Sequence, residues 1–342
     1  MRTVRLVEIA APVYRQGRLR VSSCPSCGSP PPALQILPAR NVFRCTRCGL
    51  SGGPVQYLMA SKRIGALDAA SALGLIPEVD GRRNSLLKTA ARWYASRLDL
   101  PEAEPARRFL DGRGIHRETR LRFGLGYAPP SSGTLVRHLL RRGFTVEEMA
   151  SAGLLRPSRG SYVEVLRGRL VFPITDPAGR VVGFAGRSLD GSEPKYMNTF
   201  FRKSETLYGL PQAAHALRSA GEAILVEGYT DVLTCTQNGI RNVLSLMGTS
   251  LGDRHAAILR RYVDRAVVLL DADASPAAAE KAARTLARFG ISARTVLLPD
   301  GDDPDALVRA KGPEALLRII DEQAGELPGE HETPDALAHA RP

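Results

Sequence analysis

Four cysteines near the N-terminus are spaced as metal ligands. Cys24 and Cys27 form one Cys-x2-Cys pair, Cys45 and Cys48 form a second, and seventeen residues separate the two pairs. Two such pairs supply four thiolates for one tetrahedral structural zinc ion, and this spacing is typical of zinc ribbons. The short apolar stretches between the pairs have the length of two strands. The sequence therefore predicts an N-terminal zinc ribbon with an all-thiolate site.

Acidic residues follow short apolar runs in the C-terminal third of the chain. The run 224–226 stops at Glu227, and the run 267–270 stops at Asp271 and Asp273. Such runs, separated by helical patterns, predict parallel strands, and ligands bind beyond the carboxyl ends of such strands. Crowded carboxylates repel one another unless a cation or a proton neutralises them. We therefore expect the acidic residues at this edge to bind two or three Mg²⁺ or Mn²⁺ ions, with Glu227, Asp271 and Asp273 as the catalytic acids.

A third apolar run, 295–298, precedes an acidic loop that allows two interpretations. The loop PDGDDPD carries Asp300, Asp302, Asp303 and Asp305. It is rich in turn-forming residues, so it could be a solvated turn. It could equally add ligands to the predicted metal site, and the residues alone leave both interpretations open.

The motifs EGYTDVL, GTSL, DAD and LPDGDDPDALV resemble the TOPRIM domain, in the order and spacing of bacterial DnaG-type primases. The resemblance implies a Rossmann-like parallel sheet. It places the metal-binding acids at Glu227, Asp231, Asp271, Asp273, Asp303 and Asp305. The family usually continues its paired aspartates with Ala-Gly, whereas this chain has Ala274-Ser275-Pro276. Ser275 as N-cap and Pro276 at the first helical position still favour a helix there, so we expect metal binding to be retained.

A basic segment before the TOPRIM-like motifs resembles the other half of the same polymerase core. The runs PARRFLDGRGIHRETRLRFGLGYAPP, GRLVFPITDPAGRVVGFAGRSL and PKYMNTFFRKSETLYGL predict a mixed α+β subdomain that contains a β-hairpin. The resemblance places the nucleotide- and template-binding residues at Arg122, Arg187, Lys195, Asn198 and Lys203. The chain has only six lysines, and two of them flank KYMNTFFRK. Lysine is a compact charge for phosphates, although a solvated basic face is the alternative. The family's loop between Asn198 and Phe200 is usually longer.

The cysteine-rich segment resembles the zinc-binding domain of the same primases. Many members use three cysteines and a histidine, and Cys27 stands at the position of that histidine. Arg40, Arg44, Arg47 and Phe43 could share one face of the ribbon, where arginines would contact phosphates and an aromatic ring could stack on an unpaired base. The alternative is a small fold that uses metal because its core is thin.

Composition, together with the breaks between the periodic segments, predicts a multidomain α/β protein. The 342 residues carry a net charge of +12, which favours polyanionic partners. No apolar stretch approaches the length of a membrane span and the N-terminus MRTVRLVE lacks a signal-peptide core, so we expect a cytoplasmic protein with no membrane partner. The expected domains are a zinc ribbon with linker (1–80), a basic subdomain (81–215), a TOPRIM catalytic domain (216–320) and a disordered tail (321–342).

These features predict a DNA primase, a DNA-directed RNA polymerase of DNA replication. It would make short RNA primers on single-stranded DNA from ribonucleoside triphosphates. The resemblance leaves out the C-terminal domain that docks on the replicative helicase in the family, so helicase recruitment in a primosome would need another contact. The alternatives are another TOPRIM enzyme, such as a nuclease or topoisomerase, or a non-catalytic protein that binds single-stranded nucleic acid.

Overall fold

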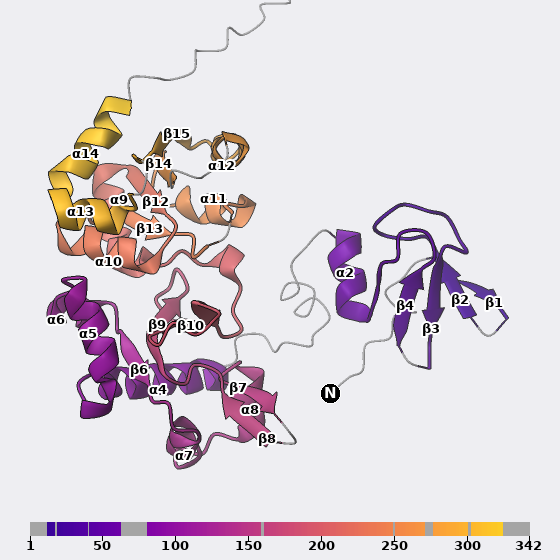
Figure 1. Cartoon of the computed structure of the whole chain (residues 1–342). Helices are drawn as coiled ribbons and strands as arrows, with labels where there is room; N and C mark the ends of the chain where they lie inside the picture. The colour runs from indigo at the N-terminus through magenta and orange to yellow at the C-terminus, as the bar shows by residue number, and fades with distance from the viewer. Residues whose placement is uncertain are drawn as a thin grey trace, which may run out of the picture. The chain divides into compact units, whose positions relative to one another are not determined.

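The computed structural model describes residues 12–17, 19–39, 41–62, 81–158, 161–248, 250–270, 276–299 and 302–323 (Figure 1). Several residues singled out above lie outside these ranges: Arg40, Asp271, Asp273, Ser275 and Asp300. Among the described helices, none is both long enough and apolar enough to cross a membrane.

The chain divides into two compact units, and neither is one continuous stretch of sequence. The first unit comprises residues 1–103, 126–173 and 180–202, and the second comprises residues 104–125, 174–179 and those from 203 onward. Segments of the basic region therefore belong to both units.

The N-terminal segment of the first unit is a five-stranded antiparallel sheet with one helix. The strands lie in sequence order: β1 (Tyr14–Gln16), β2 (Leu19–Ser22), β3 (Leu34–Leu37), β4 (Val42–Cys45) and β5 (Ser51–Gly52). Helix α2 (Pro54–Lys62) packs Tyr57 into a small core with Leu34, Ile36 and Phe43. The two strands predicted between the cysteine pairs are confirmed as β3 and β4.

The rest of the first unit is built on a four-stranded sheet of order β11-β10-β9-β6. The strands are β6 (Gly126–Ala128), β9 (Arg169–Thr175), β10 (Val181–Ser188) and β11 (Tyr196–Asn198). Strands β9 and β10 form the predicted hairpin. Around this sheet lie α4 (Gly81–Leu98), the 3₁₀ turn η1 (Pro101–Ala103), α7 (Thr134–Leu140), α8 (Val146–Ser151) and the hairpin of β7 (Leu155–Ser158) and β8 (Ser161–Glu164). Trp93 of α4 is buried.

Helix α4 and strand β6 approach each other at the backbone. A Cβ atom at Gly126 would lie 2.5 Å from the carbonyl carbon of Tyr94 and 2.8 Å from the backbone nitrogen of Ala95. Real side chains do not make such contacts, so only glycine allows this packing. The close approach buries Tyr94 against Phe184 of β10, with ring centroids 5.2 Å apart.

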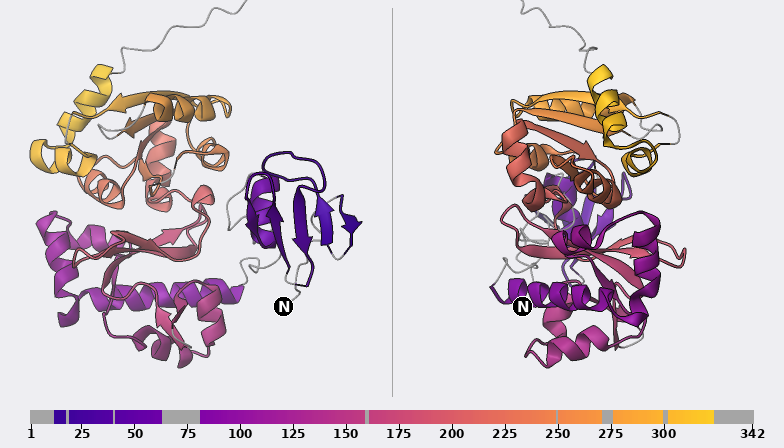
Figure 2. Two further views of the ribbon diagram at one scale, coloured as in Figure 1. Left: turned by 45° about the vertical axis from the view of Figure 1, so that its right-hand side comes forward. Right: turned by 90° about the vertical axis from the view of Figure 1, so that its left-hand side faces the viewer.

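The second unit contains the predicted parallel sheet, of order β13-β12-β14-β15 (Figure 2). Its strands are β12 (Glu222–Val226), β13 (Val243–Ser245), β14 (Arg265–Leu270) and β15 (Ser292–Leu297). The three strands expected from the apolar runs are confirmed. Strand β13 was not predicted as a strand, because three residues are too short to show a period.

Helices cover both faces of this sheet, which is why the central strands β12 and β14 are mostly apolar. On one face, α9 (Leu210–Ala220), α11 (Asp253–Leu259) and α12 (Pro276–Ala287) share a core with the strands. Helices α10 (Tyr229–Gln237), α13 (Pro304–Lys311) and α14 (Pro313–Glu322) pack on one another, and α5 (Glu104–Gly112), α6 (Arg117–Arg122) and the turn η2 (Lys203–Glu205) complete the unit.

In α12, Ala282 and Leu286 are buried, and Ala278 is exposed. One helix end differs from expectation. Helix α14 runs to Glu322, past the expected start of the tail at residue 321. The side chain of Gln323 explains the extension, because it bonds both the N–H (3.1 Å) and the carbonyl (3.0 Å) of Leu297 on strand β15. Residues 324–342 lie outside the described residues.

The contact of α4 with β6 predicts that Gly126→Ala lowers the free energy of unfolding by about 1–3 kcal/mol, because the added methyl group meets backbone atoms. Gly112→Ala is the matched control, since a Cβ there meets nothing within 4 Å. Urea unfolding followed by circular dichroism compares the two variants. Equal stabilities would contradict the packing described here.

Candidate metal centres and nucleotide-binding residues

The four cysteine sulfurs converge on one point. The Sγ atoms of Cys24 and Cys48 lie 3.7 Å apart, and those of Cys27 and Cys45 lie 3.9 Å apart. All four lie within 4.8 Å of one another. A tetrahedral ion with zinc–sulfur distances of about 2.3 Å requires sulfur atoms about 3.8 Å apart. The donor atoms therefore fit a zinc ion in number, chemistry and spacing.

Two tight turns bring the cysteines together. The N–H of Gly28 donates to the carbonyl of Cys24 (3.0 Å), and the N–H of Gly49 donates to the carbonyl of Cys45 (3.1 Å). Both glycines adopt positive φ values, +68° and +73°, which side chains rarely tolerate. The glycines next to each cysteine pair thus form the turns that the ligands need.

The two thiols of the first pair differ in acidity. Hydrogen bonds with Ser29 lower the pKa of Cys27 to about 6, while burial raises the pKa of Cys24 to about 12. A metal binds the thiolate form, so Cys24 must lose a proton when an ion binds. Metal affinity should therefore increase as the pH rises.

Phe43 and Arg44 lie on opposite faces of the ribbon sheet. Phe43 is 1% exposed and packs edge-on against Tyr57 of α2, with centroids 5.7 Å apart. The expectation that Phe43 could stack on a base is therefore wrong, because its strand position faces the core. Arg44 is exposed, and the strand register places Gln35 and Tyr14 on the same face.

The carboxyl edge of the parallel sheet carries Glu227. This residue directly follows β12 and is exposed. Strand β14 lies beside β12 in parallel, with Leu225 opposite Val268, so the two strands end at the same edge. Asp271 and Asp273 follow β14 in sequence but lie outside the described residues. Their convergence with Glu227 stays a prediction, and the strand order favours it.

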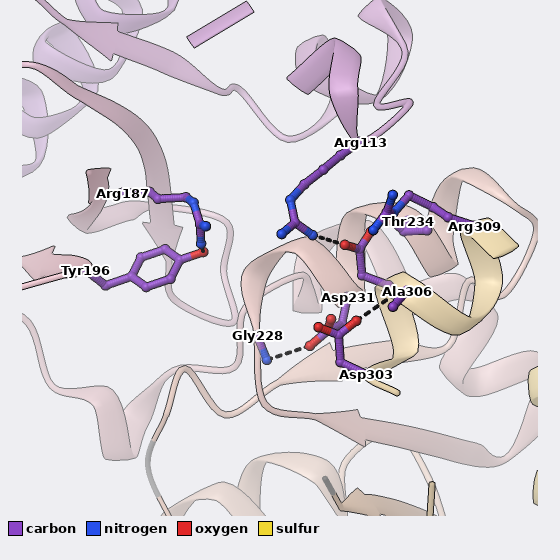
Figure 3. A network of polar contacts seen from close by, with 10 residues as sticks. Arg113, Arg187, Tyr196, Gly228, Asp231, Thr234, Asp303, Ala306 and Arg309 are labelled. Carbon is purple, nitrogen blue, oxygen red and sulfur yellow. Dashed lines mark hydrogen bonds and ion pairs between the residues drawn. The ribbon is translucent and has the colours of Figure 1, made fainter. Parts of the chain in front are cut away.

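Asp231 and Asp303 point toward one another from two helices that pack together (Figure 3). An oxygen of Asp231 accepts the N–H of Gly228 (2.8 Å) at the start of α10, and Asp231 is 6% exposed. An oxygen of Asp303 accepts the N–H of Ala306 (2.6 Å) and so caps α13. Helix N-termini stabilise negative charge, and acidic oxygens are the ligands that a divalent cation such as Mg²⁺ prefers.

Asp305 is fully buried, and its oxygens accept hydrogen bonds from protein donors. One oxygen accepts the hydroxyl of Thr234 (2.5 Å) and Nε of Arg309 (3.2 Å), and the other pairs with Arg113. The carboxylate thus joins α10, α13 and the turn after α5. Ligation of a metal by Asp305 stays a prediction, and it would require one of these partners to withdraw.

Lys203 is tied to the acidic edge through a chain of hydrogen bonds. Its Nζ donates to the carbonyl of Met247 (2.9 Å), and the N–H of Met247 donates to the hydroxyl of Ser245 (2.9 Å). That hydroxyl donates to the carbonyl of Glu227 (2.6 Å). Met247 has a φ of +58°, an uncommon conformation for a residue with a side chain. Burial lowers the pKa of Lys203.

His255 is a positioning residue that the sequence did not reveal. Its ring is 1% exposed, and its Nε2 lies 2.7 Å from the carbonyl of Lys203. The N–H of Gly252 donates to its Nδ1 (3.3 Å), so Nε2 carries the proton and donates. Burial lowers the pKa of His255, which favours this neutral form. The partner is 52 residues away along the chain, so no spacing pattern could show the contact.

Arg187 and Asn198 share one face of the first unit. The register of β10 and β11 pairs Arg187 with Tyr196 and Ala185 with Asn198, so these side chains lie on the same side. Nη1 of Arg187 donates to the hydroxyl of Tyr196 (2.9 Å), and its guanidinium lies 5.2 Å from the ring centroid (Figure 3). Tyr196, which the sequence did not single out, therefore orients Arg187.

The remaining two basic residues are exposed. Lys195 follows a segment that the buried Arg169 holds, because Nη1 of Arg169 lies 2.9 Å from the carbonyl of Pro194 and 3.5 Å from that of Lys195. Arg122, in the second unit, donates to the carbonyl of Gln212 (3.0 Å). Nothing in the sequence distinguishes Arg169 from the many other arginines of the chain, so its role was not predicted.

Comparison with known proteins agrees with this architecture. Residues 93–214 match the family model of the DNA primase catalytic core, N-terminal domain, and residues 224–308 match the Toprim-like model. The crystal structure of the Aquifex aeolicus primase, with its zinc-binding and RNA polymerase domains, is similar over 93% of this chain and 82% of that one, with a TM-score of 0.65 and 31% identity. The chain belongs to the DnaG primase family.

Two further relatives show how much of each protein the similarity covers. A DNA primase from Clostridium acetobutylicum is 32% identical over 340 residues, which cover 93% of this chain and 56% of that protein. The chain thus spans about half the length of this relative. A DnaG primase catalytic domain solved with single-stranded DNA is 34% identical, with a TM-score of 0.65, over 70% of this chain and 80% of that one.

The cysteine geometry predicts one zinc ion per chain. Cys45→Ser should abolish this zinc, because three thiolates remain, while Cys235→Ala should retain it, since Cys235 is buried in the second unit. Elemental analysis of the purified variants measures the ratio of zinc to protein. Full zinc content in Cys45→Ser would contradict the site.

The contacts of Asp305 predict that Asp305→Asn lowers the free energy of unfolding by about 3–5 kcal/mol, because two arginines lose their buried countercharge. Asp302→Asn is the control, since its ion pair with Lys311 is longer (3.6 Å) and partly exposed. Urea unfolding is measured in EDTA, so that divalent cations play no part. A loss that appears only with added Mg²⁺ would make Asp305 a metal ligand instead.

Proposed function

We propose that this chain is the synthetic core of a DNA primase, which joins ribonucleotides into short RNA primers on single-stranded DNA. The observation that carries the proposal is the hydrogen-bond chain from Lys203 through Met247 and Ser245 to Glu227. These bonds link Lys203, a side chain of the type that binds phosphate, to Glu227 directly after strand β12. A lysine and an acidic residue held near each other suit a triphosphate bound to magnesium.

The acidic edge would hold the catalytic cations. The residues assigned to Mg²⁺ or Mn²⁺ are Glu227, Asp231, Asp271, Asp273, Asp303 and Asp305, of which Asp305 is the least available. Two or three divalent ions, when bound, would lower the pKa of the primer 3′-hydroxyl and neutralise the triphosphate. Glu227, Asp271 and Asp273 are the proposed catalytic acids, because they follow adjacent strands.

The basic residues would bind and orient the nucleotides and the template. Lys203 would bind a triphosphate oxygen, and the exposed Lys195 would contact phosphate as a mobile point charge. Arg187, held by Tyr196, offers a fixed guanidinium for bidentate contact, and Asn198 on the same face offers an amide. Arg122 would contact the template strand.

The zinc ribbon, residues 1–80 with its linker, would bind template. Arg44 and Tyr14 lie on its open face, where Tyr14 is 53% exposed. Arginine can follow a phosphate backbone and an exposed ring can stack on an unpaired base. The DnaG catalytic domain solved with single-stranded DNA supports the choice of template. Residues 81–215 and 216–320 would then form the two halves of the polymerase core.

The proposal extends to location and partners. The chain would act in the cytoplasm, where ribonucleoside triphosphates and replicating DNA occur together. A replicative helicase is a further proposed partner, through a contact still to be found.

The test is synthesis on single-stranded DNA with labelled ribonucleotides and Mg²⁺ or Mn²⁺. Short RNA products should appear on a gel. Asp271→Asn and Asp273→Asn should each lower the rate at least about a hundredfold, because even indirect partners of metal ligands contribute 10–100-fold. Single-strand affinity should persist in both variants.

The control is Asp253→Asn, the same chemical change in an exposed ion pair with Arg288. It should leave synthesis unchanged. Absence of RNA products on varied templates with both metals would refute the proposal. Cleavage of plasmid DNA without ribonucleotides would indicate another TOPRIM enzyme, and binding with no synthesis would indicate a non-catalytic protein.

A further inference from the structure

Phe200 is a large apolar side chain that the fold leaves in water. It is 55% exposed, whereas the adjacent Phe201 is 6% exposed. Aromatic rings are usually buried in cores or interfaces. The other exposed aromatic rings among the described residues are those of Tyr14 and Tyr162.

The backbone on either side of Phe200 is anchored. Thr199 makes two bonds with Phe184: its N–H donates to the carbonyl (2.9 Å), and its hydroxyl accepts the N–H (2.8 Å). Phe201 packs so closely on Gly183 that a Cβ there would lie 2.6 Å from the ring. Since both neighbours are fixed in the interior, Phe200 is held at the surface.

Gly153 and Arg83 contact Phe200 and fix its position. Gly153, at a φ of +76°, lies so close that an added Cβ would be 2.6 Å from the backbone nitrogen of Phe200 and 2.8 Å from its ring. Nη2 of Arg83 donates to the carbonyl of Phe200 (3.0 Å). A ring that is fixed before binding loses little conformational freedom when it binds a ligand.

The surroundings of Phe200 carry positive charge. Arg83 lies in the first turn of α4, and Arg202 follows two residues after Phe200. Asn198, a proposed template or nucleotide contact, precedes it by two residues, or about 7 Å of extended chain. A fixed, exposed ring beside arginines has the chemistry of a stacking platform for single-stranded nucleic acid.

We infer that Phe200 stacks on an unpaired base of the single-stranded DNA template. This inference rests on the proposed function and deepens it, because it assigns a base-contacting residue to the strand. The arginines would contact the adjacent phosphates, and the ring would contact the base whatever its sequence.

The experiment compares two oligonucleotides and measures affinity by fluorescence anisotropy without nucleotides or metal. One is oligo(dT), and the other has the same length but abasic residues in place of the bases. Phe200→Ala should weaken binding to oligo(dT) about tenfold, as the loss of one aromatic stack does. It should not change binding to the abasic strand, since phosphate contacts remain. Tyr162→Ala, which removes an exposed ring from β8, is the control and should change neither.

Three results would overturn the inference. They are an unchanged affinity of Phe200→Ala for oligo(dT), an equal loss on the abasic strand, and an equal loss in Tyr162→Ala. If synthesis is intact in a protein that gives any of these results, only the role of Phe200 fails. If the wild-type chain makes no RNA yet shows the predicted base dependence, the proposed function fails instead.

Phe200→Trp supplies a direct readout. The only tryptophan of the chain, Trp93, is buried, so a new exposed indole would dominate any change in fluorescence on binding. Oligo(dT) should quench this emission and the abasic strand should not. Equal melting temperatures of wild type and both Phe200 variants would establish that folding is unaffected.

Discussion

Negative charge gathered at one edge of a parallel sheet is the constraint on which the second unit depends. Carboxylates that lie close together repel one another, so each needs a compensating group. Asp231 and Asp303 are compensated by backbone N–H groups at two helix starts, and Asp305 by two arginines and a hydroxyl. The helices α10 and α13 are thereby both structural elements and holders of the acidic edge.

The acids also differ in how accessible they are from solvent. Asp305 is enclosed and serves the fold, whereas Glu227 is exposed at a strand end. The sequence motif contains both acids and does not show this difference in exposure. Removing one partner of a buried carboxylate that lies between two arginines is strongly destabilising, because a buried charge is left uncompensated.

The positive groups are positioned by contacts that lie outside the recognisable motifs. His255 and Met247 hold Lys203, Tyr196 holds Arg187, and Arg169 holds the segment before Lys195. Each contact restricts a basic side chain or its backbone, and a group that is already oriented loses less conformational entropy if it binds a ligand. In the ribbon, the four cysteine sulfurs are brought within 4.8 Å of one another.

Local patterns in the sequence determined the elements and the chemistry. The Cys-x2-Cys pairs, the apolar runs that end in acids and the hairpin around DPAGR each depend on neighbours within a few residues, so the zinc ribbon, strands β12, β14 and β15, and the β9–β10 hairpin were predictable. Family resemblance added Asp231 and Arg187, whose roles no local pattern shows.

Only the tertiary structure decided which side chains meet. Alternation along β4 turned Phe43 into the core and left Arg44 outside, because strand register, not composition, selects the face. The enclosure of Asp305 by Arg113, 192 residues away, and the bond of His255 to Lys203 depend on packing between distant segments. Such contacts leave no periodic trace in the chain, which is why they required coordinates.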